Sequence, residues 1–170
     1  MLVGIYERFP QKVHAATSFS VSTSTRALQL MLMQTLCKLN KQAPDLKDIA
    51  DPSLSQYCII FEFGFAEAND FIYLNDEETG KLLKIINKEV FRCADFLVVI
   101  RYYKSHAGKK RPLRFDYYLL RFTFSKKSVM VSVFHERGPM RIIPEELVNL
   151  VVGSVNTNFS KRTVKPLAIS

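Results

Sequence analysis

The sequence predicts an α+β fold, with an antiparallel sheet that includes a C-terminal three-strand meander and is packed with about three helices. Two observations support this class. In the second half of the chain, three runs rich in β-branched and aromatic residues follow one another, separated by turn-forming segments, as in an antiparallel meander. Elsewhere, three segments rich in helix-forming residues begin with Ser, Thr, Asn or Pro, which are typical of helix starts.

The length and composition predict one domain. A chain of 170 residues, 48% of them hydrophobic, is long enough to bury a single core and too short to favour two. We expect the domain to span residues 1–155, and residues 156–170 to form a polar, basic and flexible tail. The sequence shows no internal repeat and no low-complexity tract.

The first half of the chain predicts two paired strands, a helix and a further strand. The paired strands span residues 2–7 and 13–21 and flank a connection that contains proline. Residues 25–39 follow several Ser and Thr side chains that suit an N-cap, and they predict the first helix. Because apolar side chains cover most of its circumference, we expect this helix to be buried on most sides. A polar connection over 40–56 leads to a strand over 57–65.

The second half predicts a helix, the meander and a last helix. Asn75 and Glu78 fit a capping box at the start of a helix that runs to about residue 88. Pro144, followed by two glutamates, predicts a helix that ends near residue 152. The meander strands are predicted over residues 94–104, 113–124 and 129–136.

Charge is divided unevenly along the chain. Residues 1–80 carry six basic and ten acidic side chains, a net charge of −4, whereas residues 81–170 carry eighteen and six, a net charge of +12. A clustered positive potential attracts polyanions, so the second half predicts a nucleic acid or another polyanion as partner. The alternative is that the charge only keeps the surface soluble.

The cysteine spacing and the length of the apolar runs indicate in which cellular compartment the protein is expected. Cys37, Cys58 and Cys93 form no C-x-x-C pair, so we expect free thiols in a reducing compartment, with a single disulfide as the alternative. No secretion signal is recognisable at the N-terminus, and no apolar run approaches the ~20 residues that span a bilayer. The sequence therefore predicts a cytoplasmic protein with no membrane partner.

The meander predicts a polar cluster at one end of the sheet. Antiparallel pairing centred on the 125–128 turn places Tyr118 opposite His135, and Asp116 opposite Arg137. Pairing centred near Gly108 places Asp116 opposite Arg101 as well. Asp116 is therefore expected to lie between two arginines.

Basic residues from the adjoining loops extend this cluster. Arginine side chains pair with phosphate oxygens, and tyrosine rings accept stacked bases, so the group suits a phosphate or nucleotide ligand. The predicted ligand-binding residues are Arg101, Lys109, Lys110, Arg111, Arg114, Asp116, Tyr118, His135, Arg137 and Arg141.

Two interpretations of this cluster stay open. Arg101, Asp116 and Arg137 also fit a structural ladder of ion pairs at the rim of the sheet, which contributes only about 0–1 kcal/mol when exposed. His135 is the single weak candidate for a catalytic residue, and a structural, hydrogen-bonded histidine is the alternative. Both faces of the meander are rich in apolar residues, so we expect helices on both sides or a partner chain, and we predict a homodimer.

The sequence does not identify a reaction. It has no Gly-rich phosphate loop, no nucleophile elbow and no metal-ligand spacing, so we predict no cofactor and no metal site. The leading hypothesis is a non-enzymatic module that binds nucleic acid, as RNA or a single strand. The alternatives are a structural or oligomerisation subunit of a protein complex, and an enzyme acting on a phosphorylated small molecule. In that enzyme His135 would act as acid or base, with Arg101 and Arg137 holding the anion.

Overall fold

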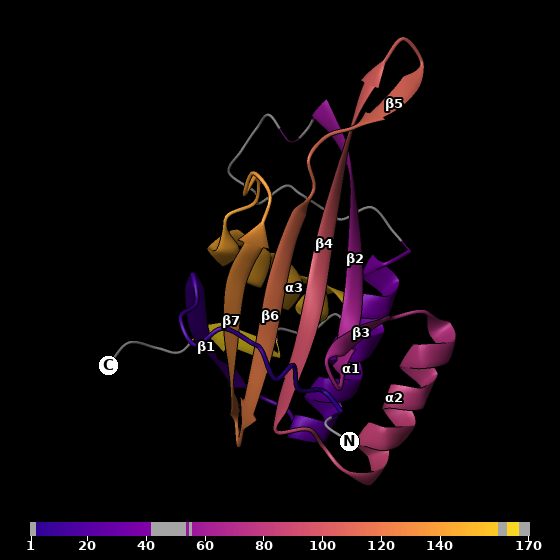
Figure 1. Ribbon diagram of the computed structural model, residues 1–170. Helices are drawn as coiled ribbons and strands as arrows, with labels where there is room; N and C mark the ends of the chain where they lie inside the picture. The colour runs from indigo at the N-terminus through magenta and orange to yellow at the C-terminus, as the bar shows by residue number, and fades with distance from the viewer. Residues whose placement is uncertain (1–2, 42–53, 55, 160–162, 167–170) are drawn as a thin grey trace.

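A computed structural model describes residues 3–41, 54, 56–159 and 163–166 of the chain (Figure 1). Over these residues it contains three helices and an eight-stranded antiparallel sheet, which confirms the predicted α+β class. The elements in chain order are β1 (Ala15–Val21), α1 (Thr25–Leu39), β2 (Tyr57–Glu67), β3 (Asp70–Tyr73), α2 (Asp76–Lys88), β4 (Cys93–His106), β5 (Lys109–Pro112), β6 (Asp116–Ser125), β7 (Ser128–Arg137), α3 (Pro144–Asn158) and β8 (Val164–Pro166).

The strand order is β3-β2-β4-β6-β7-β1-β8, and β5 pairs with the end of β4 beyond this path. The predicted meander is thus the centre of the sheet, as β4, β6 and β7. Strand β3 was not predicted. Most of the polar connection over residues 40–56 lies outside the described residues.

The helices begin where local sequence predicts. The Ser24 side chain accepts a hydrogen bond from the Ala27 N–H (3.1 Å) at the start of α1. Asn75 accepts one from the Glu78 N–H (2.8 Å) at the start of α2, whose first turn carries three acidic residues. Pro144 is the first residue of α3.

One face of the sheet is covered by helices. Helices α1 and α3 lie behind the sheet in Figure 1, and α2 packs against α1 beside β2 and β3. Alternate strand residues on this face are buried in the core, among them Phe61, Phe63, Phe65, Phe96, Val98, Leu120, Val131 and Val133. We call this side the helix face and the other side the open face.

The open face is crossed by residues 4–14, the N-terminal strap, which runs in front of the sheet in Figure 1. The predicted strand over residues 2–7 is wrong for the described residues, because only Val3 makes an isolated bridge, to Glu67. Instead the Tyr6 N–H donates to Oδ2 of the buried Asp95 (2.7 Å). Strand β1 pairs with β7 and β8, not with the strap.

Asp95 also binds Arg121, and this pair explains the path of the strap. The Arg121 guanidinium donates two hydrogen bonds to the Asp95 carboxylate (2.7 and 2.8 Å) and lies 4.2 Å over the Phe9 ring. A buried carboxylate needs such partners, because an unpaired charge in the interior is costly. The strap therefore follows a long-range contact that local sequence patterns do not encode.

Parts of the expected tail belong to a helix and a strand. Helix α3 continues to Asn158, beyond the expected end near residue 152. The Asn156 side chain exchanges two hydrogen bonds with the Val164 backbone (2.9 and 3.0 Å), and β8 pairs with β1. Residues 160–162 and 167–170 of the expected tail lie outside the described residues. Among the described helices, none is long and apolar enough to cross a membrane.

Cys37, Cys58 and Cys93 are free thiols. We expect Cys93 to react slowly with thiol reagents. Burial, followed by the nearby Asp95 carboxylate, raises the pKa of the Cys93 thiol to about 11. Because the thiolate is the nucleophile, roughly one Cys93 side chain in a thousand is reactive at pH 8. The rate of iodoacetamide labelling at Cys93, measured by peptide mass mapping, should keep rising about tenfold per pH unit up to pH 10. A rate that levels off in the ordinary thiol range would contradict this.

Candidate nucleic-acid interface

The register of β4 against β6 differs from the predicted one. Asp116 opposes Ile100, not Arg101. The β4–β5 turn is a two-residue loop of Ala107 and Gly108, both at positive φ (51° and 77°), and one extra residue is accommodated between β5 and β6. Because successive side chains of a strand point to opposite faces, Arg101 and Asp116 lie on opposite faces of the sheet.

The register of β6 against β7 is as predicted up to Tyr118, which opposes His135. A β-bulge between Tyr117 and Tyr118 then makes Tyr117 the partner of Arg137. The predicted pairing of Asp116 with Arg137 is therefore wrong. The expectation that Asp116 lies between two arginines fails for the same reason, and so does the ion-pair ladder.

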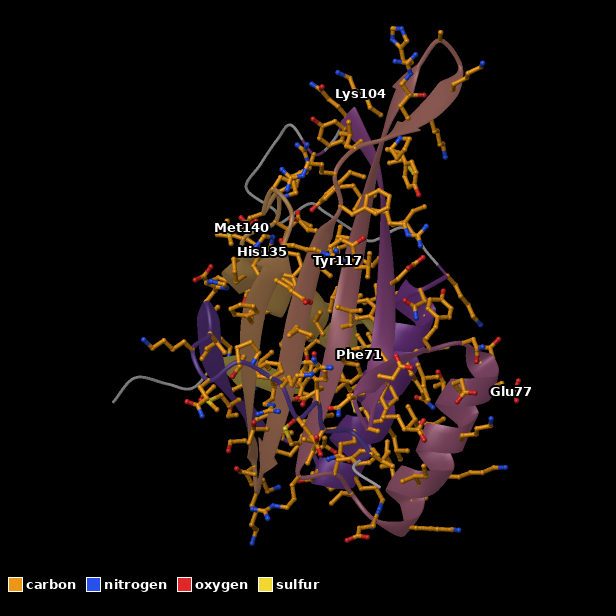
Figure 2. The ribbon with its side chains drawn as sticks, viewed as in Figure 1. Phe71, Glu77, Lys104, Tyr117, His135 and Met140 are labelled. Atoms are coloured by element: carbon orange, nitrogen blue, oxygen red, sulfur yellow. The ribbon has the colours of Figure 1, made fainter. Side chains whose placement is uncertain are left out.

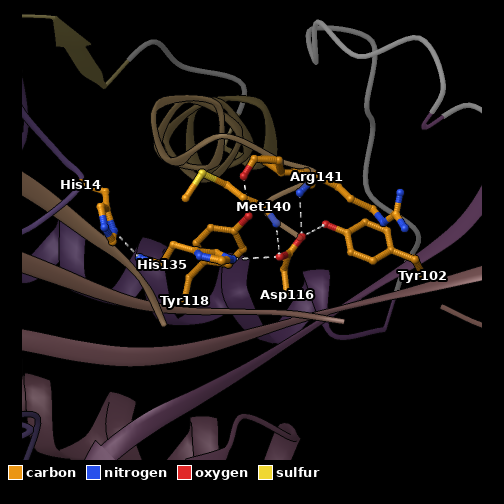
Figure 3. Close-up of polar contacts among 8 residues, drawn as sticks. His14, Tyr102, Asp116, Tyr118, His135, Met140 and Arg141 are labelled. Carbon is orange, nitrogen blue, oxygen red and sulfur yellow. Dashed lines mark hydrogen bonds and ion pairs between the residues drawn. The ribbon is translucent and has the colours of Figure 1, made fainter. Parts of the chain in front are cut away.

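Asp116 is instead held by hydrogen bonds on the helix face, none of them from an arginine side chain (Figure 3). It is fully buried and accepts hydrogen bonds from the Tyr102 hydroxyl (2.6 Å) and from the backbone N–H groups of Met140 (2.7 Å) and Arg141 (2.9 Å). The Nε2 atom of His135 lies 2.9 Å from the same carboxylate and donates to it. Asp116 thus ties the loop between β7 and α3 to the sheet.

The two buried tyrosines of this cluster remain protonated. Burial, followed by hydrogen bonding to Asp116, raises the pKa of Tyr102 far above its usual range. Burial, followed by the Asp116 charge, does the same to the pKa of Tyr118. The Tyr118 hydroxyl donates to the Ile142 carbonyl oxygen and so holds the same loop. Both phenols act as hydrogen-bond donors within the fold.

Gly138 allows the loop to approach Asp116. Its φ is +111°, and a Cβ atom at this position would lie 2.3 Å from the Phe115 carbonyl oxygen and 2.5 Å from Oδ1 of Asp116. Only glycine fits so close to the carboxylate. Packing around Asp116 therefore explains why glycine follows Arg137 at the end of β7.

Arg101 and Arg137 lie on the open face. The Arg101 guanidinium pairs with the Glu62 carboxylate (2.9 Å) on the neighbouring strand. The Arg137 guanidinium lies 3.9 Å from the centre of the Tyr117 ring. Arg141 belongs to the other side, where its guanidinium lies over the rings of Tyr57 and Tyr102 (5.3 and 5.4 Å).

The geometry that the enzyme hypothesis requires is not found among the described residues. His135 bonds Asp116 on the helix face, whereas Arg101 and Arg137 lie on the open face, so the three side chains do not converge on one pocket. Throughout the residues that the structure describes, no three His, Cys, Asp or Glu side chains lie close enough together to hold a metal ion.

The β4–β5 turn forms a projecting hairpin, Tyr103–Pro112, which we call the basic hairpin. It extends well beyond the end of the sheet, with Lys104 near its base (Figures 1 and 2). All side chains from Lys104 to Pro112 are exposed. The predicted residues Lys109, Lys110 and Arg111 are therefore accessible to a large ligand.

Two positive charges face each other across this hairpin. Lys104 lies directly opposite Arg111, and Lys109 lies opposite His106. Like charges directly opposite in a sheet are destabilising, so this arrangement does not serve the stability of the hairpin. Residues 103–115 contain five Lys or Arg and no Asp or Glu. No ion pair involves these five side chains within the described ranges.

The ten predicted site residues therefore fall into three groups at the same end of the sheet. Asp116, Tyr118, His135 and Arg141 lie together on the helix face, where the first three shape the fold. The remaining residues are Arg101 and Arg137 on the open face, and Lys109, Lys110, Arg111 and Arg114 on the basic hairpin and the connection after it.

The open face also carries half-buried aromatic side chains that were not among the predicted site residues. Phe115 lies beside Arg101 and Tyr103, and Tyr117 lies beside Arg137. Phe134 lies on the same face, where its ring stacks on His14. The alternation of aromatic residues along the meander was a usable signal, but only the correct register shows which of them share a face. No family model, curated protein or solved structure matches the chain, so a functional proposal depends on this geometry alone.

Proposed function

We propose that the protein is a non-enzymatic module that binds nucleic acid, as RNA or a single strand, through its basic hairpin and the adjoining end of the sheet. The observation that carries this proposal is the set of five exposed Lys and Arg side chains on a projecting segment without a carboxylate. Phosphate groups are the ligands that such a segment suits, because both ammonium and guanidinium groups pair with phosphate oxygens.

The shape of the hairpin supports binding to a polymer rather than to a small anion. A small ligand is usually enclosed by a pocket, whereas the hairpin projects into solvent and offers charge on both sides. Its exposed cations also attract a polyanion over a distance and speed the encounter. Arg137 and Arg141 add positive charge at the same end of the sheet, because β7 ends beside the start of β6.

Binding to a fluorescein-labelled 20-nucleotide single strand should weaken steeply with salt. If the hairpin contacts about five phosphates, the plot of log K against log salt concentration has a slope of about −3.5, because each contact on a single strand contributes about −0.7. Fluorescence anisotropy between 50 and 500 mM salt measures this slope. No detectable affinity, or a slope near zero, would contradict the proposal.

A homodimeric or protein-binding subunit is the second candidate, because the open face leaves apolar surface uncovered. Ile60 is 40% exposed there, and Val99 beside it is half-buried. Light scattering at micromolar concentration tests the predicted homodimer, and a monomer rules it out. A protein partner held by this surface should survive high salt, whereas a phosphate contact should not. The proposed cytoplasmic location remains a prediction that cell fractionation tests.

A further inference from the structure

The open face presents aromatic rings in the region between the N-terminal strap and the basic hairpin. Tyr102 and Tyr118 are fully buried under the helices, so their neighbours Tyr103 and Tyr117 point to the other side of the sheet. Figure 2 shows Tyr117 on the central strands, between the strap and the base of the hairpin at Lys104. We call Tyr103, Phe115, Tyr117 and Phe134 the aromatic surface.

Each of these rings contacts another planar group within the protein. The Arg137 guanidinium lies 3.9 Å from the Tyr117 ring centre, and the His14 ring stacks on Phe134 (4.8 Å, 17°). Phe115 contacts Tyr103 (5.9 Å). Half-exposed rings that bind cationic and aromatic planes in this way are suited to stacking with nucleic-acid bases, whose faces are similar.

The charges around the aromatic surface favour a polyanion over an apolar partner. The Glu62 carboxylate is neutralised by Arg101 (2.9 Å). Arg137 is exposed and has no ion-pair partner among the described residues, which leaves it able to turn from the Tyr117 ring to a phosphate. The Lys110 ammonium group lies 3.7 Å from the Cys58 sulfur, on the side of the hairpin that continues the open face. It adds a second cation at the border of the aromatic surface.

A base can replace Arg137 over Tyr117 at little cost. An exposed cation–π contact is weaker than base–aromatic stacking, so the exchange favours the base, and the released guanidinium gains a phosphate partner. A duplex offers no such exchange, because its bases stay stacked on one another and their faces are not free to stack on a tyrosine ring.

We propose that the aromatic surface stacks unpaired bases, so that the ligand of this protein is a single strand whose bases, as well as its phosphates, are bound. This inference rests on the proposed function, since the basic hairpin supplies the phosphate contacts. It adds a second contact area, centred on Tyr117, that distinguishes single strands from duplexes and from other polyanions.

The test compares three ligands of equal length and charge per strand: a uridine 12-mer, an abasic 12-mer and a duplex of 12 base pairs. Wild-type full-length protein should bind the uridine 12-mer at least tenfold more tightly than the abasic one, because each stacked base adds affinity. Tyr117→Leu should lose about tenfold for the uridine 12-mer and nothing for the abasic one. Tyr73→Leu, which changes an exposed tyrosine on the edge strand β3, is the matched control and should bind like wild type.

A tryptophan reporter gives a second readout that does not depend on the loss of a side chain. The chain contains no tryptophan, so Tyr117→Trp introduces a single indole whose fluorescence a stacked base quenches. Quenching by the uridine 12-mer but not by the abasic one is expected, and a Tyr73→Trp variant should show neither. Tyr117→Phe keeps the ring and should restore the wild-type preference.

The outcomes separate this inference from the proposed function. Equal affinity for the uridine and abasic 12-mers, unchanged by Tyr117→Leu, overturns base stacking and leaves phosphate binding intact. No binding to any of the three ligands overturns both. A dimer that Tyr117→Leu dissociates in sedimentation velocity assigns the aromatic surface to a second copy of the chain and also overturns the inference.

Discussion

Replacing Lys104, Lys109 and Arg111 together by glutamine is expected to weaken single-strand binding about 100-fold at 0.1 M salt. Each phosphate contact contributes about 0.7 to the slope of log K against log salt concentration. One contact therefore raises the affinity at 0.1 M salt roughly fivefold relative to 1 M, and three contacts raise it about 100-fold. The slope of log K against log salt concentration should become shallower by about 2. Anisotropy titrations of the triple variant and of wild type measure both quantities.

The hairpin itself should tolerate this change. Lys104 faces Arg111 directly across the hairpin, so the substitutions remove a repulsion instead of an attraction. All three side chains are exposed, and surface substitutions of this kind alter stability by about 0.5 kcal/mol or less. A large loss of affinity with an unchanged urea midpoint therefore reports on the ligand contact and not on folding.

A variant with the same change in net charge is the control. Lys84, Lys88 and Lys126 are exposed and lie outside the basic hairpin, and their joint replacement by glutamine lowers the charge equally. We expect this variant to lose less than about threefold in affinity, since its charges act only at long range and are screened. If both triple variants lose the same affinity, overall charge governs binding and the hairpin is not a site.

Replacing Asp116 by alanine is expected to destabilise the fold by about 3–5 kcal/mol. The carboxylate accepts hydrogen bonds from Tyr102, His135 and two backbone N–H groups, and its removal leaves these buried donors without a partner. The stability of such a domain is only about 5–15 kcal/mol, so the variant should be close to unfolding at 37 °C. Urea denaturation followed by circular dichroism measures the change.

The effect should concentrate in the loop that Asp116 holds. Hydrogen exchange at the Met140 and Arg141 amides, which donate to the carboxylate, should become fast in the variant even where the sheet stays protected. Glu136→Ala, which removes an exposed carboxylate beside His135, is the matched control and should change stability by less than about 0.5 kcal/mol. A loss below about 1 kcal/mol for Asp116→Ala would show that the cluster is not structural, and would reopen a chemical role for His135.

Local sequence was sufficient for the elements whose signals are carried by neighbouring residues. Helix α1 spans the predicted residues 25–39, because the Ser24 cap and the helix-forming residues that follow act within one segment. The starts of α2 and α3 were correct for the same reason. The concentration of positive charge in residues 103–115 is also visible in the sequence alone, although the two-residue turn and strand β5 that carry it were not predicted.

Tertiary structure decided which side chains meet, because strand faces depend on register and register depends on single residues. The two-residue turn at Ala107, the extra residue before β6 and the bulge at Tyr117 together separate Arg101 and Arg137 from Asp116. The N-terminal strap likewise takes its path from a carboxylate, Asp95, that lies far away in the sequence. The sequence by itself thus determined the fold class and the location of the charge, whereas the separation of a buried structural cluster from an open aromatic surface arose only when the strands were paired.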